Sequence, residues 1–182
     1  YANIPADTNR HEEGIRQLNE LMRAAGGDSQ QIYNLDQTRK KWNENVIEQK
    51  IRWLEEHPDD EEAKSDLAWC YLENNINDKA IELANSIDPE KSDKFNYYNL
   101  MSNIAFITED YDKVQSNLDS LIEVIKGLPE DSEENIKRKK RLGEMYGRKG
   151  YYYYHVKKLD EAMAAYEEAL ANASDKSDIL TQ

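Results

Sequence analysis

The residue types that most often carry out catalysis or bind metals are sparse in this sequence. The three histidines, His11, His57 and His155, are far apart along the chain, and none has a second ligand or a nucleophile at helical spacing. Cys70 is the single cysteine, which rules out an internal disulfide and a thiol-based metal site. The sequence has no glycine-rich loop of the kind that cradles phosphates. We therefore expect no catalytic residue, no metal site and no cofactor.

Carboxylates are abundant, and residues 59–62 form a run of four directly after Pro58. Such a cluster could bind a divalent cation or carry acid–base chemistry. It also suits the start of a helix, because acidic side chains are stabilised beside the free amides of a first turn. We interpret the cluster as a helix start.

Residues 137–141 are five consecutive lysines and arginines, a run that could form a phosphate or nucleic-acid patch. Acidic residues at 130–134 precede it closely enough for local ion pairs on one helix. The net charge of −13 opposes binding of nucleic acid and of anionic lipid. We therefore interpret the run as part of a solvated helix and expect no nucleic-acid partner.

Residues 151–154 are four successive tyrosines. Neighbouring residues of a helix point about 100° apart, so the four rings cannot form one stacking platform. We expect Tyr153 in the core, Tyr152 against a neighbouring helix, and Tyr151 and Tyr154 on an open face.

The composition describes the elements that must position these residues. Charged residues make up 34% of the chain and apolar residues 38%, with only 7 glycines and 4 prolines, which predicts a mostly helical chain with a thin, extended core. Apolar runs are short, so we expect no direct membrane insertion. Because the chain begins with Tyr1 rather than methionine, we expect that an upstream segment has been removed. The localisation stays unknown: cytoplasmic, or periplasmic or exported if that segment held a signal peptide.

Small apolar residues recur along the chain at a fixed interval. Val46, Ala80 and Val114 are each 34 residues apart, and Ala162 follows after a further 48. A 34-residue period predicts repeated helix–turn–helix units, which bury their apolar faces only by stacking on one another. The chain is therefore expected to be all-α.

The clearest unit has predicted helices over about 61–74 and 77–87. The longer interval before Ala162 holds 14 extra residues, about four helical turns. We assign them to an extension of the helix beyond Leu121 and to one long helix over about 133–155.

The amino-terminal part is less regular. Asn9 and Glu12 match a capping box that begins an amphipathic helix, which ends at Gly26 and Gly27. The next unit is degenerate, because only its second helix, over about 41–56, shows the apolar pattern.

Residues 42–174 resemble tetratricopeptide repeats, with three units and part of a fourth. The 34-residue spacing, the small residues at the helix crossings and the stretch LDEAMAAYEEAL at 159–170 carry the resemblance. It implies an all-α fold, an α-solenoid of antiparallel helix pairs in a right-handed superhelix, whose first helices line a concave groove. We accordingly expect one repeat domain at 9–174, between polar tails at 1–8 and 175–182 that fray.

The resemblance implies that the groove receives an extended peptide or a partner helix. Asn99 and Asn103 lie one helical turn apart, which suits hydrogen bonding to the backbone of an extended ligand. Trp69 is either an exposed anchor in the groove or packs under the helix over 41–56. Carried over position by position, the peptide-binding groove residues are Trp69, Leu72, Asn99, Asn103, Phe106, Arg148, Tyr151 and Tyr154.

The function implied by the resemblance is that of a non-enzymatic scaffold for protein–protein interaction. The alternative is a structural or assembly subunit that uses the ends or the convex face of the stack. Either one is compatible with an exported, lipid-anchored scaffold. The clamp with which some family members hold acidic chaperone tails is matched only at Arg148, so such a tail is not expected. The negative net charge favours a neutral to basic protein or peptide partner, and the oligomeric state stays unknown.

Replacing Ala80 by leucine tests the register of the repeats. Ala80 is a predicted small residue at a helix crossing, so the larger side chain should overpack the crossing and lower the free energy of unfolding by about 1–3 kcal/mol. Thermal melts of Ala80→Leu and the wild type check this, and identical melting curves would show that the register is wrong.

Overall fold

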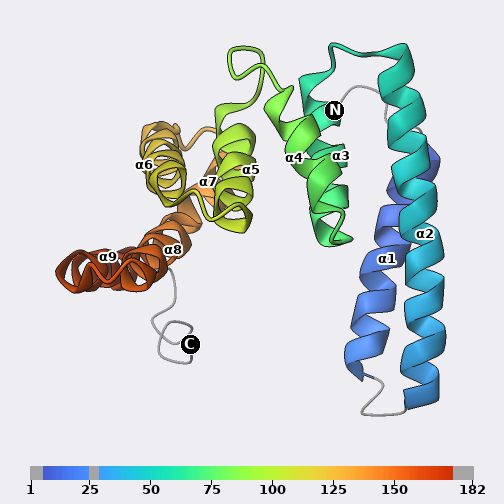
Figure 1. Ribbon diagram of the computed structural model, residues 1–182, viewed down its shortest axis with the longest axis horizontal. Coiled ribbons are helices and arrows are strands. Elements are labelled where there is room, and N and C mark those ends of the chain that lie inside the picture. Colours follow the sequence, from blue (N-terminus) through green and yellow to red (C-terminus); the bar gives the residue numbers. More distant parts are fainter. Residues whose placement is uncertain (1–5, 25–28, 174–182) are drawn as a thin grey trace. The chain divides into compact units, whose positions relative to one another are not determined.

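A computed structural model describes residues 6–24 and 29–173 of the chain. The described residues form helices joined by short turns, with no strand among them (Figure 1). This confirms the all-α helical-repeat fold expected from the sequence. The helices fall into two compact units, one up to Ile87 and the other from Asp88 onward.

The first unit consists of two helix pairs. Helix α1 (Ala6–Ala24) packs along α2 (Ser29–Glu56), and α3 (Glu61–Glu73) packs against α4 (Asn77–Asn85). Helix α2 also contacts α3, so the two pairs are stacked (Figure 1). The small residues at the α3–α4 crossing are fully buried, as the 34-residue register predicts: Ala68, Ala80 and Ala84.

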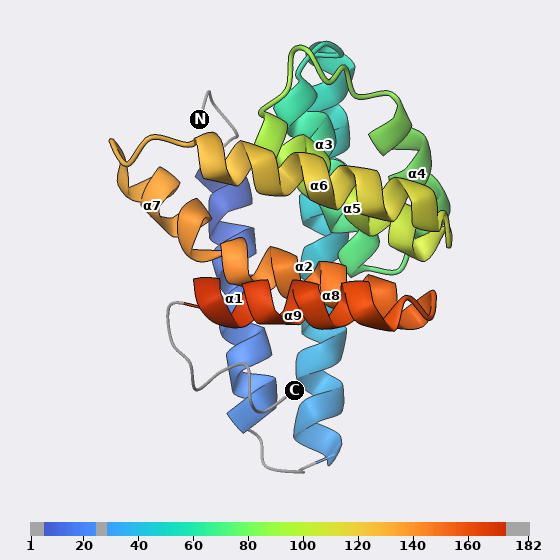
Figure 2. The ribbon, with the colours of Figure 1, turned by 90° about the vertical axis from the view of Figure 1, so that its left-hand side faces the viewer.

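The second unit repeats this arrangement and adds one short helix. Helix α5 (Lys94–Ile107) pairs with α6 (Tyr111–Gly127), and α8 (Leu142–His155) pairs with α9 (Leu159–Asn172). Helix α8 packs on α6, which joins the two pairs (Figure 2). The added helix is α7 (Glu133–Lys140).

The start of the chain differs from the sequence-based prediction. Helix α1 begins at Ala6, so Asn9 lies inside the helix and is not its cap. Helix α2 is continuous over 28 residues and forms the partner of α1, so the degenerate unit has no separate first helix after residue 29. The predicted helix end at Gly26 and Gly27 and the predicted carboxy-terminal tail lie outside the described residues.

The acidic run at residues 59–62 starts a helix, as predicted. Asp60 is the N-cap of α3, and its carboxylate accepts a hydrogen bond from the amide of Ala63 at 2.9 Å. The indole of Trp53 donates a second hydrogen bond to this carboxylate at 3.0 Å. Burial raises the pKa of Asp60, but these hydrogen bonds outweigh it, so the net pKa is lowered.

The turns of three helix pairs, α3–α4, α5–α6 and α8–α9, share one geometry, which recurs at the 34- and 48-residue intervals of the sequence. Asn75, Glu109 and Lys157 all adopt positive φ, at 59°, 56° and 61°, between the first and second helices of their pairs. In each turn the next residue donates its amide to a carbonyl five residues earlier, as in Asp110 to Ala105 at 2.9 Å. This is the Schellman helix end, and it reverses the chain in the same way each time. Glycine is the usual marker of such turns, and none of these residues is glycine.

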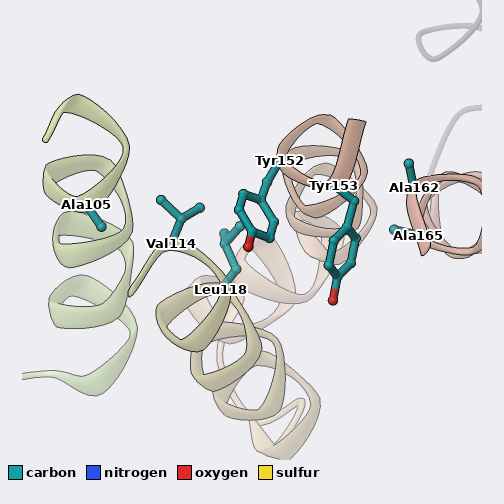
Figure 3. Close-up of a cluster of buried hydrophobic side chains, with 7 residues drawn as sticks. All are labelled: Ala105, Val114, Leu118, Tyr152, Tyr153, Ala162 and Ala165. Atoms are coloured by element: carbon teal, nitrogen blue, oxygen red, sulfur yellow. The ribbon is translucent and has the colours of Figure 1, made fainter. Parts of the chain in front are cut away.

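The core of the second unit forms where α6, α8 and α9 meet. Figure 3 shows Tyr152 beside Leu118 of α6, and Tyr153 on the side of Ala162 and Ala165 of α9. Tyr151 and Tyr154 are exposed. The predicted distribution of the four tyrosines around the helix is therefore confirmed.

The predicted single helix over residues 133–155 is wrong, because the chain breaks at Arg141 between α7 and α8. Contacts of Arg138 stabilise α7 as a separate helix that does not continue into α8. Its guanidinium lies 4.7 Å from the ring centroid of Phe95 and 3.0 Å from the carboxylate of Asp93, both at the start of α5. It also forms the predicted local ion pair with Glu134 at 2.9 Å. The predicted extension of α6 is confirmed, because Ile122 and Ile125 are buried within it.

Two glycines of α8 form a matched pair for testing the α8–α9 crossing. A Cβ atom added to Gly150 would lie 2.8 Å from the ring of Tyr166 on α9, whereas one added to Gly147 would meet nothing within 4 Å. Gly147→Ala is expected to raise the free energy of unfolding by about 0.5–1 kcal/mol, because alanine is the better helix former. Gly150→Ala is expected to be about 1–3 kcal/mol less stable than Gly147→Ala, because the ring must move. Urea unfolding of both variants measures the difference, and equal stabilities would contradict the observed crossing.

Candidate functional site

The predicted groove residues are divided between the two units. Trp69 and Leu72 lie on α3 in the first unit. Asn99, Asn103 and Phe106 lie on α5, and Arg148, Tyr151 and Tyr154 lie on α8, all in the second unit. Each unit therefore has its own candidate surface.

In the first unit, Trp69 lines a pocket of about 680 Å³ between α1, α2 and α3. Its indole is half-buried, beside Val46 and Lys50 of α2. Trp69 thus lines this pocket together with residues of α2. Leu72 is half-buried and is not among the described residues that line the pocket.

The pocket beside Trp69 carries charges of both signs. Helix α1 contributes Arg16, Glu20 and Arg23, a pattern with two cations and one carboxylate. Lys50 is buried, and its ammonium lies 3.6 Å from the carboxylate of Asp66. A pocket of this mixed character suits a polar segment of chain better than an apolar ligand.

In the second unit, Arg148 reaches from α8 across to α5. Its guanidinium donates hydrogen bonds to the side-chain oxygen of Asn99 at 3.1 Å and to the hydroxyl of Ser102 at 3.0 Å. A weaker contact joins it to the sulfur of Met145 at 3.8 Å. These partners are all uncharged, and burial lowers the pKa of Arg148. Arg148 therefore ties the two first helices together and keeps a desolvated positive charge.

The asparagine pair is less available than the sequence suggested. The side-chain oxygen of Asn99 accepts from Arg148, and the side-chain amide of Asn103 donates to the backbone oxygen of Asn99 at 2.7 Å. Sequence reasoning missed this internal role of Asn99, because Arg148 is 49 residues away and only the helix stacking brings the two together.

Exposed aromatic rings lie on the two helices that this linkage joins. The ring centroids of Phe106 and Tyr151 are 5.9 Å apart, and His155 makes an edge contact with Tyr151 at 4.4 Å. Tyr154 lies 6.2 Å from His155 on its other side. We call these four residues, Phe106, Tyr151, Tyr154 and His155, the aromatic strip. His155 was missed as a site residue, although its position one turn after Tyr151 is the signal that could have found it.

In the part of the chain that the structure describes, no group of three or more histidine, cysteine, aspartate or glutamate side chains converges. None of the helices there has the length and apolar character needed to cross a bilayer. Four residues of the basic run at 137–141 form ion pairs, among them Lys137 with Glu133 at 2.7 Å and Lys139 with Glu130 at 3.3 Å.

The family model of the tetratricopeptide repeat matches residues 52–104. Residues 52–104 are tetratricopeptide repeat sequence. The match runs from the end of α2 through α3 and α4 into α5, so it includes Trp69, Leu72, Asn99 and Asn103. A search of curated proteins found no match to the chain. Tetratricopeptide repeats are protein-interaction modules and are typically non-enzymatic, which supports a general role in protein interaction.

The linkage between Arg148 and Asn99 can be tested by unfolding measurements. Arg148→Met is expected to leave the free energy of unfolding unchanged or to raise it, because it removes a desolvated charge that has no charged partner among its hydrogen bonds. Asn99→Ala is expected to lower it by about 1–3 kcal/mol, because the guanidinium then lacks an acceptor. In the double variant the effect of Asn99→Ala should largely disappear. Strictly additive effects would contradict the linkage.

Proposed function

We propose that this tetratricopeptide protein is a non-enzymatic scaffold that binds an extended peptide or a partner helix along the α5–α8 face of its second unit. The observation that carries the proposal is the contact between Phe106 and Tyr151, two exposed rings on α5 and α8, the same two helices that the partly buried Arg148 linkage joins. Large aromatic residues dominate binding energy at interfaces, and a fixed pair loses little conformational entropy when a ligand binds.

The partner in this proposal is neutral to basic. The chain has a net charge of −13, and the guanidinium of Arg148 is already occupied by Asn99 and Ser102, so it offers little to an acidic ligand. The exposed faces of Tyr151 and Phe106 can take a lysine or arginine side chain by cation–π contact. Asn103 lies one helical turn before Phe106 on α5, and its side-chain oxygen can accept a hydrogen bond from a peptide backbone.

Trp69 belongs to a different surface, in the first unit. The pocket that it lines in the first unit has both positive and negative groups, which suits a polar chain segment. We propose this pocket as a second contact surface, with Trp69 as its apolar anchor.

The role of the aromatic strip can be tested with peptides that are selected from a displayed library for binding to the full chain. Fluorescence anisotropy then gives the dissociation constant of a selected peptide for the wild type, Phe106→Ala and Tyr151→Ala. Each variant is expected to weaken binding by about 2 kcal/mol, roughly 25-fold, because an aromatic anchor is lost. The association rate should fall as salt is added, because screening weakens steering by the acidic protein.

Tyr33→Ala is the matched control, since Tyr33 is an exposed tyrosine on α2 of the first unit. It should leave the affinity unchanged, and thermal melts should show that all variants fold. If peptides bind both strip variants as tightly as they bind the wild type, the α5–α8 face is not the binding site.

A further inference from the structure

Helix α9 has two apolar faces, and only one of them is covered. The buried face consists of the alanines Ala162, Ala165 and Ala169, which pack toward α8. The second face consists of large residues that are exposed, Leu159, Met163, Tyr166 and Leu170, of which Tyr166 also packs its ring against Gly150 of α8. At about 100° per residue these four lie within roughly 60° of one another, so they form one stripe along the helix. We call it the α9 stripe.

Two residues of the α9 stripe, Tyr166 and Leu170, have apolar equivalents on α6 that show what covers such a face, whereas Leu159 and Met163 correspond to the exposed Tyr111 and to Gln115. Val114 of α6 and Ala162 of α9 are equivalent by the repeat register, 48 residues apart. By the same offset, Leu118 corresponds to Tyr166 and Ile122 to Leu170. Leu118 and Ile122 are 1% and 3% exposed, whereas Tyr166 and Leu170 are 37% and 39% exposed.

Helix α8 supplies the cover on α6. Leu118 shares a core cluster with Tyr152 and Tyr153, and Ile122 shares one with Met145, all three from α8. No helix follows α9 among the described residues, so its equivalent face stays open. The geometry that fits this face is therefore that of another helix, packed as α8 packs on α6.

One ion pair in the second unit indicates which charge a helix covering the α9 stripe would carry. Lys149 of α8 forms an ion pair with Asp119 of α6, beside the covered face. By the 48-residue offset, the residue of α9 equivalent to Asp119 is Glu167, which is exposed. A covering helix with lysine at the position of Lys149 would meet Glu167 in the same way.

The charges of α9 disfavour a second copy of α9 as the occupant. The helix has four acidic residues, Asp160, Glu161, Glu167 and Glu168, and no lysine or arginine. Asp160 and Glu167 border the α9 stripe, because they lie about 90° and about 70° around the helix from its centre. Two copies packed stripe to stripe would bring like charges together.

We propose that the α9 stripe binds a helix of a partner protein, and that this helix presents large apolar residues with a lysine beside them that pairs with Glu167. Tyr166 of the α9 stripe lies near Tyr151 and Tyr154 of the aromatic strip, so this proposal is tested at Leu170 and Glu167, which are not part of that strip.

The test uses a labelled helical peptide of about 20 residues on an alanine–glutamine background. It carries Met, Lys, Tyr and Tyr with the spacing of Met145, Lys149, Tyr152 and Tyr153. A second peptide has glutamate in place of the lysine, and a third has the first composition in scrambled order. Fluorescence anisotropy with the full chain is expected to show binding of the lysine peptide at least about tenfold tighter than binding of the other two.

Variants of the chain then locate the binding. Leu170→Gln should weaken the lysine peptide about tenfold or more, whereas Ile136→Gln, at an equally exposed residue on α7, should leave it unchanged. Glu167→Lys should reverse the preference, so that the glutamate peptide binds tighter than the lysine peptide. This charge swap would support the proposed pairing, because overall acidity alone cannot produce it.

Four outcomes would overturn the proposal. The first is equal binding of the lysine and scrambled peptides, and the second is unchanged binding by Leu170→Gln. The third is a dimer in sedimentation experiments that Leu170→Gln dissociates, because the occupant would then be a second copy. The fourth is an increase of tenfold or more in affinity when residues 174–182 are deleted, because the chain's own end would then occupy the stripe.

Discussion

The second helix of a pair has two apolar faces, and this constraint governs how the units are built. One face packs on the first helix of the same pair through small residues, as Ala162 and Ala165 of α9 do against α8. The other face is buried only when the next pair packs on it, as α8 packs on α6 and covers Leu118. Stability is therefore distributed over contacts between neighbouring pairs, and α9, the last described helix of the second unit, has a largely exposed apolar face.

The Arg148 linkage connects this packing to the proposed site. Stacking places α8 beside α5, and the guanidinium then joins Asn99 and Ser102 across the contact. A charge kept in a partly buried position without a charged partner contributes little net stability, but it fixes the geometry of the helices that carry it. Phe106 and Tyr151 project from these same helices, so their contact depends on the linkage.

Much of the fold could be predicted from the sequence, because its signals are local and periodic. The buried small residues, the acidic start of α3 and the distribution of the four tyrosines all follow from helical periodicity. The break at Arg141 could not be predicted, because residues 133–155 are equally compatible with one helix. Arg138 decides between the alternatives through its contacts with Phe95 and Asp93, which are distant in sequence.

The sequence by itself determined the repeat period, the helix pairs and the faces that they bury, since these depend on residues a few positions apart. It also identified Tyr151 and Tyr154 as exposed. Only the tertiary structure decided that Asn99 holds Arg148, that His155 joins the aromatic strip and that the stripe of α9 is open. These features depend on which helices become neighbours. The contacts and the exposure of a side chain are therefore set only when the neighbouring helices of the stack are in place.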